Sequence, residues 1–217
     1  MTLKDINMKL VKKARILIYV IAFLLVVATW LVYSKEGTMT TDMSNAFGYL
    51  AFSFLSLALI VTPIRVIWPK FELNTTFLMA RRALGVSAFI FALFHSSIQF
   101  FVNFAGDINI LSTYASANIF LLFGSISLTI LFLLFITSTD YAVRKLGKTW
   151  FSLHKLVYLA YPVIILHAYK IGLDFLDGKI DLYSGSFLVI AAITILLEII
   201  RICFSLSKPK ITSSDSL

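Results

Sequence analysis

The three histidines of the chain are the residues whose type and position could support chemistry. His95, His154 and His167 all lie within strongly apolar stretches, and none lies in a polar connecting segment. Neutral imidazole is the commonest metal ligand in proteins, and it can bind haem iron axially while its other nitrogen donates to a nearby oxygen. Ionisable side chains in apolar spans are costly, which makes them functional candidates. The pattern therefore indicates a buried metal or haem site.

Each histidine taken singly has a second interpretation, as a hydrogen-bonded structural residue. The placement of all three in apolar stretches favours ligands. A catalytic zinc needs three clustered protein ligands. His154 and His167 are thirteen residues apart, roughly 20 Å along a helix, so a zinc site is the weaker hypothesis. The side chains that could orient the imidazoles by hydrogen bonds are Ser96, Ser97, Tyr158 and Tyr169.

The composition places this chain outside the range of soluble domains, because 59% of its 217 residues are hydrophobic and 14% are charged. Apolar runs long enough to cross a bilayer occupy 16–33, 46–67, 82–104, 117–139, 150–171 and 185–206. They predict an all-α integral membrane protein with a six-transmembrane-helix bundle over 16–206, a cytoplasmic N-terminal segment over 1–15 and a disordered cytoplasmic tail over 207–217. The run 150–171 is expected to form one helix that carries both His154 and His167.

The net charge of +8 reflects membrane topology rather than nucleic-acid binding. With alternating spans, 16 of the 19 basic residues fall on one side, and the other three are Lys35, Lys170 and Lys179. Because basic residues are enriched in cytoplasmic loops, this side and both termini are predicted to be cytoplasmic. The opposite side is mildly acidic and carries Glu36, Asp42, Asp107, Asp174, Asp177 and Asp181.

This topology places His95 and His167 in the same half of the membrane. The runs 82–104 and 150–171 both start on the cytoplasmic side, so both histidines are expected in the outer half. Their estimated depths differ by roughly 7 Å, which helix tilt can absorb. A haem between these two helices is the simplest assignment. His154 is expected near the cytoplasmic face.

Polar residues elsewhere in the spans leave further alternatives open. Arg65, Arg81 and Arg82 lie at the cytoplasmic ends of helices, where they contact phospholipid or pair with a carboxylate or phosphate of a cofactor. Glu198 is a candidate proton relay, but Arg201 follows three residues later on the same helix face and favours a local ion pair. The small residues in the second and fourth spans, which include Gly48 and Gly124, are interpreted as helix-packing positions.

Three segments resemble the ferric-reductase-like transmembrane domain family. They are VTPIR (61–65), RRALGVSAFIFALFH (81–95) and LGKTWFSLHKLVYLAYPVIILH (146–167), and the resemblance covers about 46–171. Within this family the chain is most similar to the haem-binding membrane subunits of bacterial periplasmic methionine-sulfoxide reductase systems.

The resemblance implies a bundle that binds one or two b-type haems. His95 and His167 would be the axial ligands of an outer haem. His154 would serve an inner haem, with Met79, a non-protein ligand or an open position completing its coordination. Arg65, Arg81 and Arg82 would then be partners of haem propionates or of FMN or a quinone.

By the same resemblance the protein is an electron-transfer subunit in the bacterial inner membrane. It would carry electrons from a cytoplasmic flavin reductase or a membrane quinol to a periplasmic molybdenum-containing methionine-sulfoxide reductase. Two other functions remain open: transmembrane reduction of ferric iron or another outer acceptor, and a transporter or scaffold without redox chemistry.

Overall fold

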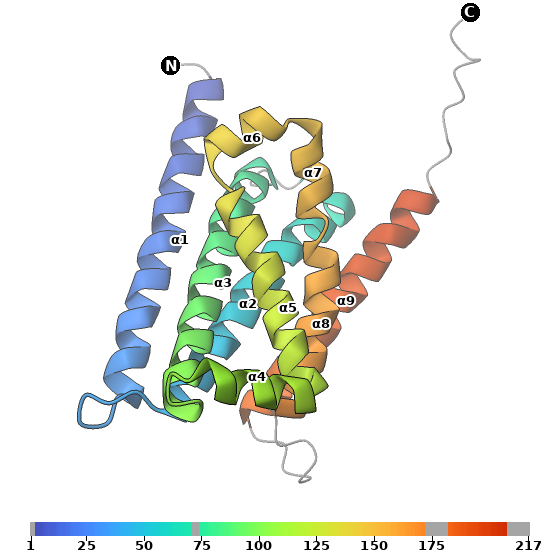
Figure 1. Cartoon of the computed structure of the whole chain (residues 1–217). Coiled ribbons are helices and arrows are strands. Elements are labelled where there is room, and N and C mark those ends of the chain that lie inside the picture. The colour runs from blue at the N-terminus through green and yellow to red at the C-terminus, as the bar shows by residue number, and fades with distance from the viewer. Residues whose placement is uncertain (1–2, 71–73, 172–181, 208–217) are drawn as a thin grey trace, which may run out of the picture.

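The computed structural model describes residues 3–70, 74–171 and 182–207, and these residues form a bundle of helices (Figure 1). The helices are α1 (Leu3–Tyr33), α2 (Thr41–Ile67), α3 (Asn74–Asn103), α4 (Ile108–Ala117), α5 (Ile119–Ile136), α6 (Asp140–Leu146), α7 (Lys148–His154), α8 (Val157–Ile171) and α9 (Leu182–Leu206). Six segments within the described ranges are long and apolar enough to cross a membrane: α1, α2, α3, α5, α7 with α8, and α9. The prediction of an all-α, six-span membrane protein is confirmed.

The bundle consists of two groups of helices. In the first, α2 packs against α1, α3 and α9, and α1 also packs against α3. In the second, α5 packs against α8 and α4. The contact of α3 with α5 joins the two groups. The short helix α4 crosses one end of the bundle, and α6 lies at the other end (Figure 1).

Helix α4 is an element that the hydrophobicity pattern did not predict. Its ten residues are too few to span a bilayer, for which about 20 are needed. Asp107 begins it, because its side chain accepts a hydrogen bond from the backbone N–H of Asn109 at 2.7 Å. Asn118 ends α4 and caps α5 by accepting from the N–H of Phe120 at 3.0 Å. These caps set the corner between the two helices and shorten the predicted span 117–139.

The membrane span predicted over 150–171 is present, but it is not one continuous helix. The chain forms α7 and α8, separated by a turn at Lys155 and Leu156. In this turn the N–H of Leu156 donates to the Leu153 carbonyl at 3.0 Å, a tighter bond than the α-helical one. Pro162 does not cause this break, because it lies inside α8 and its missing N–H affects only the carbonyl of Tyr158, one turn after the interruption.

Three other segments outside the predicted spans also differ from their predicted boundaries or lie outside the described residues. Helix α1 begins at Leu3, so residues 3–15 continue the helix of the first span instead of forming a separate extension. The connection between the predicted spans 117–139 and 150–171 contains α6, which ends at Leu146 and is followed by Gly147 as its C-cap. Of the predicted tail 207–217, residues 208–217 lie outside the described residues.

The core of the bundle is rich in aromatic side chains. Phe47 of α2 and Phe91 of α3 are almost fully buried, and Phe47 also stacks on Phe94 at 5.1 Å between ring centroids. Tyr161 attaches α8 to α2, since its hydroxyl lies 2.8 Å from Oγ of Ser56. These contacts fix the helices that carry the histidines.

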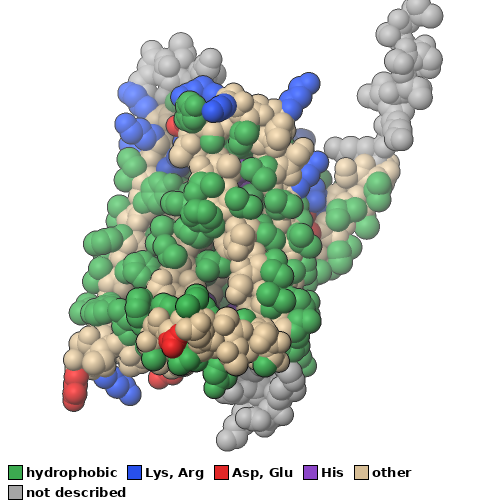
Figure 2. All heavy atoms as spheres, in the orientation of Figure 1, with side chains coloured by type: hydrophobic (Ala, Val, Ile, Leu, Met, Phe, Trp, Pro, Cys, Tyr) green, Lys and Arg blue, Asp and Glu red, His purple; other side chains and the backbone are tan. Residues whose placement is uncertain are grey.

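The charged side chains divide between the two ends of the bundle. Lys and Arg gather at the end formed by the start of α1 and by α6, as Figure 2 shows, whereas acidic residues appear mainly at the α4 end. Arg201 donates to Glu198 at 2.6 Å, which confirms the predicted ion pair within α9.

Candidate functional site

A cavity of about 950 Å³ lies between the two helix groups, on the α4 side of the bundle. Its wall includes Phe52, Leu55 and Leu131 at the apolar end. Toward α4 the wall becomes polar and includes Asn45, Ser96, Gln99, Asn103, Tyr114 and Asn118. His95 and His167 both line this cavity, and His154 does not. Pockets that bind small molecules and cofactors have volumes of about 300–1,000 Å³, so this cavity has the size of a cofactor site.

His95 projects from α3 toward the first turn of α2. Its Nδ1 lies 2.9 Å from the carbonyl oxygen of Ser44, and the Ser44 hydroxyl donates back to the His95 carbonyl at 3.0 Å. A carbonyl oxygen can only accept, so Nδ1 carries the proton. In a neutral imidazole this leaves the lone pair on Nε2, and no hydrogen bond from the described part of the chain occupies that nitrogen.

His167 is held by an equivalent contact on the other side of the cavity. It projects from α8, and its Nδ1 lies 2.8 Å from the carbonyl oxygen of Phe120 in the first turn of α5. Again Nδ1–H donates and Nε2 is left as the ligand nitrogen; among the residues that the structure describes, none bonds to it.

The two imidazoles lie next to each other on opposite sides of the cavity. Their ring centroids are 6.3 Å apart, with an angle of 79° between the ring planes. Half of this separation is close to a metal–nitrogen bond of about 2 Å plus the distance from that nitrogen to the ring centre. The donor pair, its backbone-fixed tautomers and the cavity volume therefore fit a haem with two axial histidines.

The predicted hydrogen-bond partners of these histidines were wrong. Backbone carbonyls of Ser44 and Phe120 orient the rings, whereas Ser96 donates to the carbonyl of Leu93 within its own helix. Sequence reasoning proposed Ser96, Ser97, Tyr158 and Tyr169 because they are near the histidines in the chain. The actual partners come from other helices, and a backbone carbonyl leaves no signal in the side-chain pattern.

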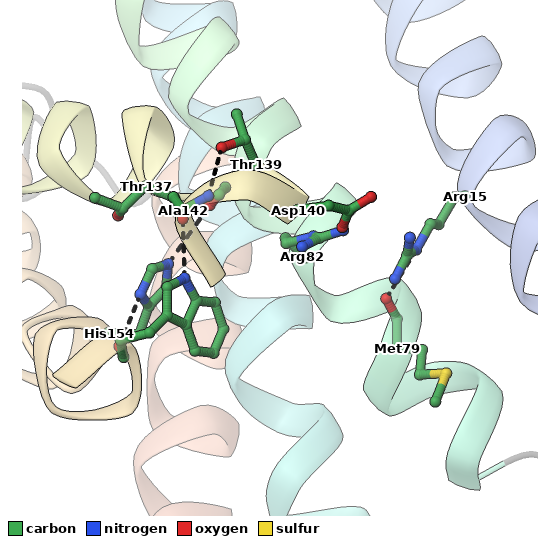
Figure 3. A network of polar contacts seen from close by, with 10 residues as sticks. Arg15, Met79, Arg82, Thr137, Thr139, Asp140, Ala142 and His154 are labelled. Carbon is green, nitrogen blue, oxygen red and sulfur yellow. Dashed lines mark hydrogen bonds and ion pairs between the residues drawn. The ribbon is translucent and has the colours of Figure 1, made fainter. Parts of the chain in front are cut away.

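His154 lies apart from this pair, at the basic end of the bundle. Its ring stacks on Trp150 at 3.9 Å between centroids, and its Nδ1 lies 3.1 Å from the Trp150 carbonyl. Its Nε2 is 3.5 Å from Oγ of Ser138. Figure 3 shows the ring directly beside the segment that carries Thr137 and Ala142. Both ring nitrogens thus have a polar neighbour, unlike those of His95 and His167.

The three arginines lie at the same end as His154 and away from the cavity. Arg82 forms an ion pair with Asp140 at the start of α6 (Figure 3). Through this hydrogen bond and its charge, Arg82 holds the pKa of the Asp140 carboxyl below its ordinary value. Arg81 donates to Oγ1 of Thr62 at 2.9 Å, and Arg65 is exposed near the end of α2. The structure therefore groups these arginines with α6 and α2.

Metal coordination by protein side chains alone finds no support in the described ranges, which contain no group of three or more His, Cys, Asp or Glu side chains that could hold an ion. A two-histidine site needs the remaining ligands from the bound group itself, as the porphyrin of a haem provides. The arrangement can therefore bind a redox cofactor in an apolar environment between two helix pairs.

Comparison with known proteins agrees with this geometry. The model of the family described as "Ferric reductase like transmembrane component" matches residues 47–165. A heme-binding subunit of protein-methionine-sulfoxide reductase, MsrQ, from Brucella anthropi is 38% identical over 149 residues, which cover 66% of this chain and 64% of that protein. The MsrQ of Brucella ovis is 36% identical over 156 residues, covering 70% of this chain and 68% of that protein. The matched region thus spans slightly less than two thirds of the first of these relatives.

Proposed function

Because this chain belongs to the ferric reductase-like transmembrane family, we propose that it is a haem-binding electron-transfer subunit of a membrane reductase. His95 and His167 are its axial ligands, and one haem b occupies the cavity between them. The observation that carries this proposal is the pair of imidazoles, whose ring centroids lie 6.3 Å apart. In each ring Nδ1–H donates to a backbone carbonyl, which leaves Nε2 to bind a metal.

The residues of the chain determine how such a group is held. The carbonyls of Ser44 and Phe120 fix the tautomer of each imidazole and increase the basicity of Nε2. The apolar wall around Phe52 and Leu131 excludes water from one end, and the amides of Asn45 and Gln99 supply donors toward the other end. When bound, the haem supplies one-electron redox chemistry, while the bundle provides orientation and insulation.

The partners follow from the relatives and from the charge distribution. The relatives are named as subunits of a protein-methionine-sulfoxide reductase, so we propose that electrons pass to a periplasmic, molybdenum-containing catalytic subunit of that kind. The basic end is cytoplasmic by the positive-inside rule. In this orientation the protein lies in the bacterial inner membrane and receives electrons from a flavin reductase or a quinol.

The basic end is the proposed entry point for electrons. Arg65 and Arg81 lie there, and a guanidinium can pair with the phosphate of FMN or polarise a quinone oxygen. Arg82 is already paired with Asp140, so it contributes through α6 rather than as an isolated cation. The inner haem that the resemblance implies at His154 is the alternative to this single-haem proposal, and the polar neighbours of both nitrogens of that ring favour one haem.

The test is a difference spectrum, reduced minus oxidised, of purified protein expressed with haem supplied. The wild type, His95→Ala, His167→Ala and His154→Ala variants are compared, each with a pyridine haemochrome count. We expect one b-type haem in the wild type, its loss in the first two variants and its retention in His154→Ala, which serves as the matched control.

The other outcomes are equally informative. Two haems per chain, one of them lost with His154, would replace the single-haem proposal by the two-haem one. A colourless wild type would remove electron transfer and leave a transporter or scaffold. To identify the acceptor, dithionite-reduced protein is mixed with the periplasmic sulfoxide reductase or with chelated ferric iron. Reoxidation by ferric iron alone would overturn the proposed partner.

A further inference from the structure

The rings of His95 and His167 contact two different neighbouring helices through the same local arrangement. On α2 the carbonyl of Ser44 accepts from His95, and on α5 the carbonyl of Phe120 accepts from His167. A glycine follows each carbonyl by four residues, Gly48 in α2 and Gly124 in α5. Residues four apart lie on the same face of a helix, so each imidazole meets a carbonyl and a glycine together.

Helix geometry explains why the second residue must be small. The carbonyl of residue i points toward residue i+4, and the Cα–Cβ bond of residue i+4 is tilted back toward the helix N-terminus. A side chain at i+4 therefore lies beside the carbonyl of residue i. An imidazole that approaches this carbonyl from a neighbouring helix occupies the same space.

The distances show how little room is present. A Cβ built on Gly124 would lie 2.6 Å from Cε1, 2.8 Å from Nδ1 and 3.1 Å from Nε2 of His167. A Cβ built on Gly48 would lie 3.0 Å from Nδ1 and 3.2 Å from Cε1 of His95. Favourable contacts between carbon atoms begin at about 3.5 Å. The constraint is therefore severe at Gly124 and moderate at Gly48.

We propose that the Ser44/Gly48 and Phe120/Gly124 pairs are positioning sites, which fix the orientation and tautomer of the two histidines and thereby tune the bound haem. This inference rests on the proposed haem function. The glycines act through the histidine rings and not on the cofactor itself. They are more than the helix-packing positions that the sequence indicated, because the atoms they face belong to an imidazole.

A methyl group at position 124 is expected to push the His167 ring from the Phe120 carbonyl. Loss of that hydrogen bond makes Nε2 a weaker electron donor, which destabilises the ferric state and shifts the reduction potential of the haem upward. Loss of an outer partner of a metal-binding histidine typically lowers affinity by about 10- to 100-fold. Gly48→Ala is expected to have the same effects at smaller size.

The experiment compares Gly124→Ala, Gly48→Ala and Gly85→Ala in full-length, haem-loaded protein. Gly85 of α3 is the matched control, since a Cβ at that position meets no atom within 4 Å. Haem affinity, the potential and the low-spin electron paramagnetic resonance signal are measured. We expect an upward potential shift and altered signal in Gly124→Ala, a smaller change in Gly48→Ala and none in Gly85→Ala. Wild-type potential and signal in Gly124→Ala would overturn the proposal.

A double-mutant cycle in haem-free protein separates this proposal from the haem function. Gly124→Ala is made in the wild type and in His167→Ala, and the thermal stability of all four proteins is measured. If the added methyl collides with the ring, Gly124→Ala destabilises only the protein that contains His167. If Gly124→Ala lowers the stability equally with and without His167, the proposed contact between position 124 and the His167 ring is refuted. This holds even if Gly124→Ala alone fails to fold. A wild type that binds no haem would refute the function and leave the cycle to test the contact.

Discussion

Haem binding is expected to join the two helix groups and to stabilise the protein by an amount that can be measured. His95 belongs to the group of α1, α2, α3 and α9, whereas His167 belongs to the group of α4, α5 and α8. Near the basic end the groups are already joined by Phe89 and Phe135, whose rings stack at 4.5 Å. Tyr161 of α8 also contacts Ser56 of α2. Toward α4 the cavity lies between the two groups, so a ligand bound by both histidines would add a connection there.

The size of the effect follows from mass action. A ligand that binds only the folded state stabilises it by about 2.7 kcal/mol when its free concentration is 100 times Kd. For a protein of this size, 1 kcal/mol corresponds to a change in Tm of about 2–4 °C. Loading with haem should therefore raise Tm by about 5–10 °C, and the rise should grow with the logarithm of the free haem concentration.

The assay is thermal unfolding in detergent over a series of haem concentrations, with hydrogen exchange measured in parallel. Protection is expected to increase most in the α4-side parts of α5 and α8, over 119–128 and 164–169, because these segments line the cavity away from the contact between Phe89 and Phe135. His167→Ala serves as the variant that lacks this connection. A haem-loaded wild type with the Tm and exchange pattern of this variant would refute the reasoning.

Three further perturbations have defined outcomes. Ser56→Ala leaves the Tyr161 hydroxyl without its 2.8 Å partner and is expected to cost about 0.6–2 kcal/mol of unfolding free energy in a denaturant titration; Tyr161→Phe in the same background should recover part of that loss. Asp140→Asn removes the ion pair with Arg82, an exposed contact worth less than about 1 kcal/mol. Because the pKa of Asp140 is lowered in the folded state, this stabilisation is present above the ordinary pKa and is lost as the pH falls through the lowered value. The difference in Tm between Asp140→Asn and wild type should therefore vanish in acid, and a difference that persists there would contradict the assignment. Gly147→Ala places a side chain at φ +51° with an expected cost of about 1–3 kcal/mol, and an unchanged Tm would show that the turn relaxes.

The predicted parts of the fold are those that depend on hydrophobicity alone. Six apolar runs gave six spans, because each crossing requires about 20 apolar residues. The helix α4 was missed since its sequence is neither long nor strongly apolar. The break before α8 was missed because residues 150–171 form one apolar run, and its composition gives no sign of the turn at Lys155 and Leu156.

The sequence predicted that His95 and His167 lie close together, and the structure places their rings 6.3 Å apart at one cavity; their role as haem ligands stays a prediction. Their common depth followed from the topology, although the estimate along the chain left a mismatch that helix tilt had to absorb. The carbonyls that orient them could not be predicted, because Ser44 and His95 meet only after α2 and α3 pack. Gly48 and Gly124 were visible as small residues, but their partners depend on the same tertiary contact.

The separation of the histidine pair from the basic end has an energetic consequence for the cell. In the proposed orientation the pair lies toward the outer surface, and electrons enter at the end where Lys and Arg gather (Figure 2). Each electron then moves outward through a membrane that is negative inside, which releases up to about 2.3 kcal/mol per 100 mV of membrane potential. Electron transfer through this subunit would thus be driven in part by the voltage and would consume it, while return of the electron to the cytoplasm would be opposed by the same field.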